Sequence, residues 1–183
     1  MAQRIVLVRH GQTPWNFEGR LQGQVDIPLN AAGRAQARQA GRQLAEEYDA
    51  GSWDAVVASP LGRAAETAAI IAAELGLEPG EPEPGLVERG YGEGEGVVVT
   101  GMPRPELDAL LSTAEPEAEV VERGVRALTG LAAAHPGRGL VVVAHGTLIR
   151  LVVGHLQGAP HARLENGQVV ELDPALLPEL DAV

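Results

Sequence analysis

The chain has 183 residues, of which 45% are hydrophobic, and this suits one domain over residues 1–183 with a buried core. It contains no cysteine, which excludes disulfides, thiolate nucleophiles and cysteine-bound metals. All 14 basic residues are arginine, which excludes a lysine Schiff base and a phosphate loop of the Gly-Lys-Ser/Thr type.

The formal net charge is -11, and no apolar run approaches the roughly 20 residues that span a bilayer. We therefore expect no nucleic-acid and no membrane partner, since binding to nucleic acid depends largely on basic side chains that neutralise phosphates. The apolar stretch at 5–8 is too short for the core of a signal peptide, so we expect a cytoplasmic protein. The oligomeric state stays open, with a homodimer as one alternative.

Short apolar runs alternate with helical patterns along the chain, and these runs are typical of strands buried on both faces of a sheet. In chain order we expect a strand at 5–8, an irregular polar segment at 10–29, a helix at 30–48, a strand at 55–58, a helix at 59–75, a long loop at 76–101 with room for a short strand, helices at 105–113 and 117–134, a strand at 140–144, a helix at 147–156 and a strand at 168–172. This alternation predicts a three-layer α/β/α sandwich with a mostly parallel central sheet.

Three finer features also follow from residue types. Asn30 is the expected N-cap of the first long helix. Asn166 and Gly167 are expected to form a hairpin turn that joins residues 161–165 to the last strand. We expect the tail from Asp173 to be poorly ordered.

Basic and imidazole side chains directly follow the three buried runs. Arg9 and His10 follow the first run, Arg63 lies one helical turn beyond the second, and His145 follows the third. Because ligands bind beyond the carboxyl ends of strands in open α/β sheets, we expect these four side chains to meet at one edge. Any one of them alone would be an ordinary capping or surface residue, and only their joint occurrence indicates a site.

This set of side chains suits phosphoryl transfer. Guanidinium groups bind phosphoryl oxygens bidentately, one imidazole can attack phosphorus, and a protonated second imidazole can donate to an oxygen. Gly11 and Gly146 lack a Cβ, so the backbone could approach a bound phosphate there. The first amides of the helix at 147–156 would point to the same anion. A metal site is disfavoured, because the neighbouring arginines would repel a cation.

Six segments of the chain carry motifs of one enzyme family. In the family's order they are 7–13 with Asn16, 21–23, 26–29, 59–68, 86–92 and 143–146. Together they resemble the histidine phosphatase superfamily, whose members include cofactor-dependent phosphoglycerate mutases and many small phosphatases. The resemblance implies a phosphoglycerate mutase-like fold and a small-molecule phosphate ester as substrate, with no cofactor and no metal.

The resemblance also implies a role for each site residue. His10 would be the nucleophile that becomes phosphorylated. Glu88 would be the general acid that protonates the leaving oxygen and then the base that activates water. Arg9, Arg63 and His145 would complete the phosphate pocket. The residues that would line the pocket or bind the substrate are Gly11, Thr13, Asn16, Gln22, Gly23, Tyr91 and Gly146.

The proposed chemistry makes opposite demands on the two imidazoles. His10 must be neutral to attack, whereas His145 acts best as a cation, so their environments must move their pKa values apart. A backbone carbonyl that accepts from the other ring nitrogen of His10 would fix its tautomer. Glu88 must carry a proton when it acts as an acid, so we expect burial or the phosphate charge to raise its pKa.

Two departures from the family pattern concern the substrate pocket. Gly94 stands where relatives often have a bulky aromatic residue, so we expect the loop at 91–96 to pack less firmly and to move more. The segment 117–119 lies where relatives often have Gly-Glu-Ser, and it lacks the serine.

Mutases of the family carry additional lysine and arginine residues and an insertion that holds a phosphorylated acid. This chain is short and has no lysine, so the resemblance favours hydrolysis over phosphate transfer back to a substrate. We therefore expect a metal-independent phosphatase that hydrolyses small phosphomonoesters. Two alternatives stay open: a phosphoglycerate mutase-type phosphotransferase, and a catalytically silent module that binds phosphate or a protein.

Overall fold

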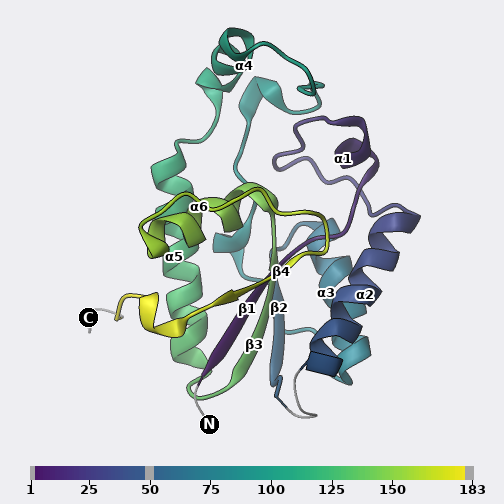
Figure 1. The fold of residues 1–183 in the computed structure, drawn as a ribbon, viewed down its shortest axis with the longest axis vertical. Coiled ribbons are helices and arrows are strands. Elements are labelled where there is room, and N and C mark those ends of the chain that lie inside the picture. The colour runs from purple at the N-terminus through teal and green to yellow at the C-terminus, as the bar shows by residue number, and fades with distance from the viewer. Residues whose placement is uncertain (1–2, 48–51, 180–183) are drawn as a thin grey trace.

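The computed structural model describes residues 3–47 and 52–179, in which a four-stranded sheet lies between two layers of helices (Figure 1). In chain order the elements are β1 (Arg4–Arg9), α1 (Pro14–Glu18), α2 (Ala31–Glu47), β2 (Ala55–Ala58), α3 (Gly62–Leu75), α4 (Arg104–Leu110), α5 (Glu117–Ala134), β3 (Gly139–Ala144), α6 (Gly146–Gln157) and β4 (Val169–Leu172). The predicted strands and long helices are thus present within a few residues of their expected bounds. The three-layer α/β/α sandwich is confirmed.

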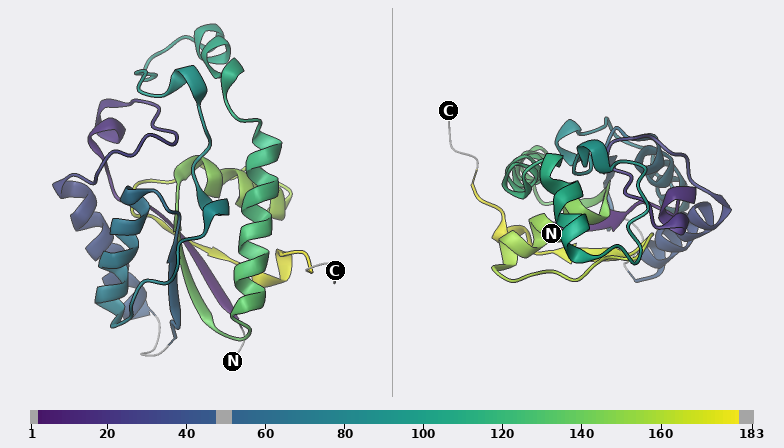
Figure 2. Two further views of the ribbon diagram at one scale, coloured as in Figure 1. Left: turned by 180° about the vertical axis from the view of Figure 1, so that it is seen from behind. Right: turned by 90° about the horizontal axis from the view of Figure 1, so that it is seen from above.

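The strand order is β2-β3-β1-β4, and β3 pairs in parallel with both β1 and β2. Alternate residues of β1 enter the two cores of the protein. Ile5 and Leu7 pack with residues of α5 and α6, whereas Val6 and Val8 pack with residues of α2 and α3. Figure 2 shows these two helix layers on opposite faces of the sheet. Because β1, β2 and β3 are parallel, their carboxyl ends share one edge, and α1 and α4 lie beyond that edge (Figure 1).

The segment at 10–29 is not wholly irregular, because it contains the short helix α1. Thr13 caps this helix in a reciprocal capping box with Asn16, Pro14 occupies the first turn, and Gly19 ends it at φ 71°. A helix of five residues is too short for a hydrophobic period, so only the capping residues could have predicted it. Asn30 caps α2 as expected, with its Oδ1 accepting from the Gly33 N–H at 2.8 Å. Tyr48, the expected last residue of α2, lies outside the described residues.

The expected hairpin at Asn166 and Gly167 is wrong. These residues do form a turn, with Gly167 at φ 76°, but residues 161–165 form no strand. β4 instead pairs antiparallel with β1, where Leu172 stands opposite Ile5 and becomes buried. This pairing fills the exposed edge of β1 and covers the adjacent core, which a local hairpin would leave open.

The expected poorly ordered tail is wrong for residues 173–179. Asp173 caps a 3₁₀ helix, Pro174–Leu176, with its Oδ1 accepting from the Ala175 N–H at 2.9 Å. Leu177 then packs against the core next to α5 and α6. The remainder of the expected tail, 180–183, lies outside the described residues.

The long loop at 76–101 contains no strand in the described structure. It includes the 3₁₀ helices Pro84–Leu86 and Gly92–Gly94, and single bridges join Pro79 to Val56 and Val98 to Arg20. A third such helix, Leu111–Thr113, follows α4. None of the helices in the described part of the chain is both long enough and apolar enough to span a membrane.

Candidate active site

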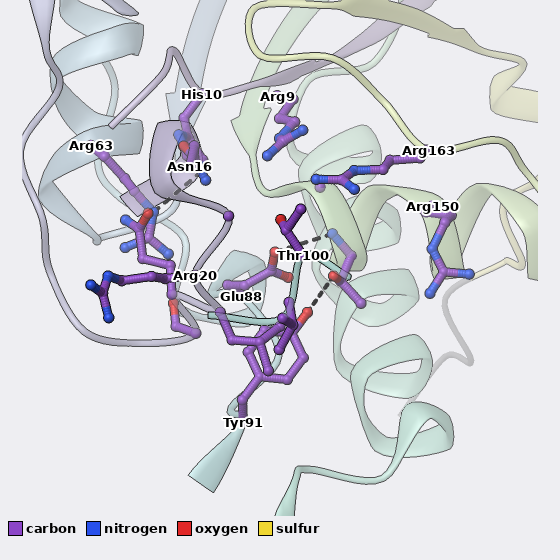
Figure 3. Close-up of a pocket in the computed structure, with 17 residues that line it drawn as sticks. Arg9, His10, Asn16, Arg20, Arg63, Glu88, Tyr91, Thr100, Arg150 and Arg163 are labelled. Carbon is purple, nitrogen blue, oxygen red and sulfur yellow. Dashed lines mark hydrogen bonds between the residues drawn. The ribbon is translucent and has the colours of Figure 1, made fainter. Parts of the chain in front are cut away.

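A pocket of about 300 Å³ opens at the carboxyl ends of the parallel strands (Figure 3). Nine of the twelve site residues expected from the sequence line it: Arg9, His10, Asn16, Gln22, Gly23, Arg63, Glu88, Tyr91 and Gly146. The other three, Gly11, Thr13 and His145, are buried behind its wall.

His10 presents one ring nitrogen to the pocket in a defined tautomer. Its Nδ1 lies 2.7 Å from the carbonyl oxygen of Gly11, so Nδ1 carries the proton and donates to this carbonyl. The lone pair is therefore on Nε2, which accepts from Nε of Arg63 at 3.3 Å. Burial, together with the charges of Arg63 and Arg9, holds the pKa of His10 well below its usual value. His10 is thus the neutral imidazole that attack on phosphorus requires.

His145 is fully buried behind His10, and the two rings meet edge to face with centroids 5.2 Å apart. Its Nε2 lies 2.8 Å from Oγ of Ser59, while Nδ1 is buried without a hydrogen-bond partner among the described residues. Burial, followed by the charge of Arg63, holds the pKa of His145 well below its usual value. The sequence-based expectation of a cation is therefore not met, because this imidazole is desolvated beside positive groups.

Arg63, in the first turn of α3, is fixed by two backbone carbonyls on the opposite side of the pocket. Its Nη2 donates to the Gly23 oxygen at 2.6 Å, and its Nη1 donates to the Val25 oxygen at 2.8 Å. Burial lowers the pKa of Arg63 to about 10, although the charges of Glu88 and Asp26 oppose this shift. Arg63 therefore remains a cation at neutral pH.

Arg9 is a second buried guanidinium in the pocket wall, and it reaches the pocket from the end of β1. Its Nη1 donates to the carbonyl oxygen of Leu164 at 2.5 Å, while its Nε is buried without a partner among the described residues. Burial lowers the pKa of Arg9, and the charge of Glu88 opposes this shift. Gly146 packs against this side chain, since a Cβ there would lie 3.0 Å from Nε of Arg9.

Amide side chains hold the loop around His10. Asn166 donates through Nδ2 to the carbonyl oxygen of His10 at 3.1 Å and to Oδ1 of Asn16 at 3.2 Å. Oδ1 of Asn16 also accepts from the Thr13 N–H, so the Asn16 amide nitrogen is the atom that remains for a ligand. In the sequence, Asn166 is marked only as a turn residue, and its contact with the backbone of His10 depends on the turn before β4.

Gln22 links the same loop to Arg63. The side chains of Thr13 and Arg63 both find a hydrogen-bond partner in one orientation of the Gln22 amide. In this orientation the amide nitrogen donates to Oγ1 of Thr13 at 2.6 Å, and the oxygen accepts from Nη1 and Nε of Arg63 at 3.0 Å each. Thr13 is fully buried, so its role is to support Gln22 and α1 rather than to line the pocket.

Gly11 has a packing role that the sequence analysis did not predict. A Cβ at this position would lie 2.2 Å from the carbonyl oxygen of Gly33 in α2, and one at Gly33 would lie 2.1 Å from the Gln12 oxygen. The two glycines therefore let the backbones of residues 11–12 and of α2 approach each other. The expectation that Gly11 makes room for phosphate is wrong, because this residue faces α2 and does not line the pocket.

Glu88 lies on the opposite wall of the pocket and is only 7% exposed. Its Oε1 accepts from the N–H groups of Leu148 at 3.0 Å and Arg89 at 2.9 Å, and its Oε2 accepts from the Thr147 N–H at 3.1 Å. The anion at the N-terminus of α6 is thus the Glu88 carboxylate. This corrects the expectation that these amides face the phosphate, and it gives Glu88 a fixed orientation.

Arg123 of α5 clamps the segment that carries Glu88. Its Nη1 donates to the carbonyl oxygens of Gly85 and Val87 at 3.0 and 2.6 Å, and its Nη2 donates to the Glu88 oxygen at 3.2 Å. Glu115 pairs with Nε and Nη2 of this guanidinium at 2.8 and 2.9 Å. Burial opposes ionisation of Glu115, but the hydrogen bonds from Arg123 and from the Gly90 N–H outweigh it and lower its pKa. The sequence offered no motif for this clamp.

Replacing Arg123 with alanine should lower the free energy of unfolding by about 2–3 kcal/mol, because five hydrogen bonds are lost and the Glu115 carboxylate loses its partner. Turnover should fall as well, since Glu88 loses its support. Denaturant unfolding and steady-state kinetics measure the two effects. The matched control is Arg126→Ala, whose exposed ion pair with Glu122 should contribute no more than about 0.5 kcal/mol. Equal stabilities of the two variants would contradict the clamp.

The loop at 91–96 is packed, contrary to the loose packing expected from Gly94. Its Tyr91 hydroxyl is hydrogen-bonded to Oγ1 of Thr147 at 2.5 Å. Burial, followed by the charge of Glu88, raises the pKa of Tyr91, so the phenol stays protonated. A Cβ at Gly94 would lie 3.1 Å from Leu21 and 3.3 Å from Leu110. Neighbouring leucines therefore occupy the space beside Gly94.

The pocket also contains four polar residues that the sequence analysis missed, in addition to Thr147. They are Arg20, Thr100, Arg150 and Arg163. No local pattern identifies them, although the spacing of three residues between Thr147 and Arg150 places both on one face of a helix. In the described parts of the chain, no three histidine, aspartate or glutamate side chains are grouped so as to hold a metal ion.

Comparison with known proteins assigns the family. The family described as the histidine phosphatase superfamily (branch 1) matches residues 5–177. The uncharacterized phosphatase PhoE of Bacillus subtilis (strain 168) is 36% identical over 154 residues, which cover 84% of this chain and 77% of that protein. Phosphoglycerate mutase-like protein 4 of Arabidopsis thaliana is 36% identical over 158 residues, which cover 80% of this chain and 67% of that protein. The chain therefore belongs to the histidine phosphatase superfamily.

A solved structure shows the same fold. The mycobacterial glucosyl-3-phosphoglycerate phosphatase in complex with VO3 matches with a TM-score of 0.81 at 28% sequence identity, over 94% of this chain and 93% of that one. The family, the relatives named phosphatases and this fold make the chain a phosphatase enzyme rather than a silent binding module.

Proposed function

We propose that this phosphatase hydrolyses small phosphomonoesters through a phosphohistidine on His10, without a metal ion. The observation that carries the proposal is the contact of Gly11 O with Nδ1 of His10, which leaves the Nε2 lone pair in the pocket beside Arg63. Arg9 and Arg63 supply the positive charge that a metal ion would otherwise bring to the phosphoryl oxygens.

In the first step, Nε2 of His10 attacks phosphorus and the bond between phosphorus and the ester oxygen breaks. Glu88 donates a proton to that oxygen, so the alcohol leaves as a neutral molecule. Nε of Arg63, which donates to the Nε2 lone pair at 3.3 Å, turns to a phosphoryl oxygen when that lone pair forms the new bond. The other ring nitrogen of His10 keeps its proton, with Gly11 O stabilising the positive charge that develops on the ring.

In the second step, the Glu88 carboxylate takes a proton from water as the water oxygen attacks phosphorus. The bond between nitrogen and phosphorus breaks, its electron pair returns to Nε2, and inorganic phosphate leaves. The proton that Glu88 gives up in the first step is thus replaced in the second. The backbone amides that fix its orientation keep one carboxyl group in place for both proton transfers.

The proposal predicts hydrolysis of 4-nitrophenyl phosphate in the presence of EDTA, with rates unchanged by dialysis against the chelator. Vanadate should inhibit competitively, because its trigonal bipyramidal form resembles phosphorus under attack. Release of nitrophenol and of inorganic phosphate measures the reaction. Activity that disappears with EDTA and returns with a divalent metal would contradict the proposal.

A second candidate function is the transfer of a phosphoryl group between two hydroxyl groups of a substrate, because one relative is named as mutase-like. A mutase would convert 3-phosphoglycerate to 2-phosphoglycerate, in the presence of a bisphosphorylated primer, faster than it releases inorganic phosphate. We expect this protein to release inorganic phosphate faster than it forms 2-phosphoglycerate. Both products can be measured in one reaction.

A further inference from the structure

Two arginines on the pocket wall have no partner in the described structure. Arg150 of α6 and Arg163 of the segment after α6 line the pocket, yet neither forms a hydrogen bond or an ion pair with any residue in 3–47 or 52–179. Their neighbours differ in this respect. Arg20 pairs with Glu18 and donates to the Gly96 oxygen, and the guanidinium groups at the phosphate centre are held by carbonyls.

Both arginines reach the pocket from the wall that α6 provides. Arg150 lies three residues after Thr147, on the helix face that also carries Gly146 in the pocket wall. Arg163 directly precedes Leu164, whose carbonyl oxygen fixes Arg9. Figure 3 shows both side chains on the side of the pocket away from Arg20 and Arg63, with Arg163 next to Arg9.

Positive side chains are concentrated on this side of the pocket. Burial lowers the pKa of Arg9 most, and the positive charge of Arg163 lowers it further, while the charges of Glu88 and Glu165 act in the opposite direction. The chain has 25 acidic residues, but none lies within ion-pair distance of Arg150 or Arg163 in the described structure. Arg9 and Arg63 already supply the positive charge that one phosphoryl group requires. Arg150 and Arg163 therefore provide more positive charge than phosphate alone needs.

We propose that Arg150 and Arg163 bind a second anionic group of the substrate. The preferred substrates are then phosphomonoesters that also carry a carboxylate or a second phosphate close to the ester. This inference rests on the proposed phosphatase function and adds the class of substrate to it. The pair determines specificity and takes no part in the chemical steps.

Matched pairs of substrates test the proposal. One pair is 3-phosphoglycerate and glycerol 3-phosphate, which differ by a carboxylate in place of a hydroxymethyl group. The other is fructose 1,6-bisphosphate and fructose 6-phosphate, which differ by a second phosphate. We expect the wild-type kcat/KM to favour the more anionic member of at least one pair by about tenfold or more, and the pair that shows this identifies the group bound.

The variants Arg150→Gln and Arg163→Gln should each reduce that preference by about tenfold, mainly through KM, because a charge-assisted hydrogen bond to the second anion is lost. Arg150→Lys should restore part of it. The loss with glycerol 3-phosphate should be smaller than the loss with the more anionic substrate. Arg104→Gln, in an exposed ion pair on α4, is the matched control and should leave all four rates unchanged.

Three results would overturn the inference: a wild-type enzyme without preference in either pair, a preference that survives both substitutions, or an equal loss on all four substrates. A wild-type enzyme that does not hydrolyse 4-nitrophenyl phosphate would instead contradict the phosphatase mechanism. The two failures are thus distinguishable. Thermal unfolding of each variant separates loss of specificity from loss of folding.

Discussion

Replacing His10 with alanine should reduce turnover of an aryl phosphate by about four orders of magnitude or more, because the substitution removes the proposed nucleophile. The wild-type protein mixed with substrate and quenched in alkali should gain the mass of one phosphoryl group. The His10→Ala variant should show no such gain. Rapid-quench mass spectrometry and steady-state kinetics measure both results.

The control for this experiment is His155→Ala, at an exposed position near the end of α6, which should keep turnover within about twofold. Because His10 is buried, His10→Gln provides a second variant of more similar size, and the melting temperatures of both show whether folding is retained. Turnover that survives in either folded variant, or a phosphorylated His10→Ala protein, would show that another group attacks phosphorus.

Replacing Glu88 with glutamine should affect two substrates in different ways. With glycerol 3-phosphate, kcat/KM should fall by about 10²–10⁴, because the alkoxide leaving group needs a proton. With 4-nitrophenyl phosphate, the first step should be nearly unchanged, since nitrophenolate leaves without protonation. The second step should be slow because water lacks its base. A burst of nitrophenol and accumulation of phosphorylated His10 should follow, as stopped-flow absorbance and mass spectrometry would show.

The comparison of the two substrates distinguishes loss of proton transfer by residue 88 from displacement of its side chain. The glutamine oxygen can still accept from Leu148 and Arg89, but its amide nitrogen would face the Thr147 N–H, so some displacement of the side chain is expected. Displacement alone would slow both substrates equally and produce no burst. The control is Glu93→Gln, an exposed carboxylate in the same loop, which should leave both rates within about twofold.

Much of the phosphate centre could be predicted because it depends on local patterns joined by one topological rule. The runs at 5–8, 55–58 and 140–144 are β-branched and uninterrupted, which indicates strands covered on both faces. Parallel strands end at one edge, so the residues that follow them had to converge. Arg9, His10 and Arg63 line one pocket for that reason, with His145 packed directly behind His10.

Long-range contacts decided the features that the sequence did not indicate. The helix N-terminus of α6 was predictable, but its anion comes from Glu88, which lies 59 residues before Thr147 in the chain. The segment that carries Glu88 is held by Arg123, which is hydrogen-bonded to Glu115. No periodic pattern in the sequence indicates this contact. β4 pairs with β1 rather than with its neighbour in sequence, because the exposed edge of β1 offers both backbone partners and a core to cover.

The sequence by itself determined the order of the elements and the parallel sheet, because these follow from uninterrupted apolar runs, from the helical period of 3.6 residues and from local capping. The roles expected of the site residues came from the resemblance to the family. Only the tertiary structure decided the charge of His145, the packing role of Gly11 and the presence of Arg150 and Arg163 in the pocket. Desolvation and Coulomb interactions depend on distances through space, and residues distant in sequence set those distances.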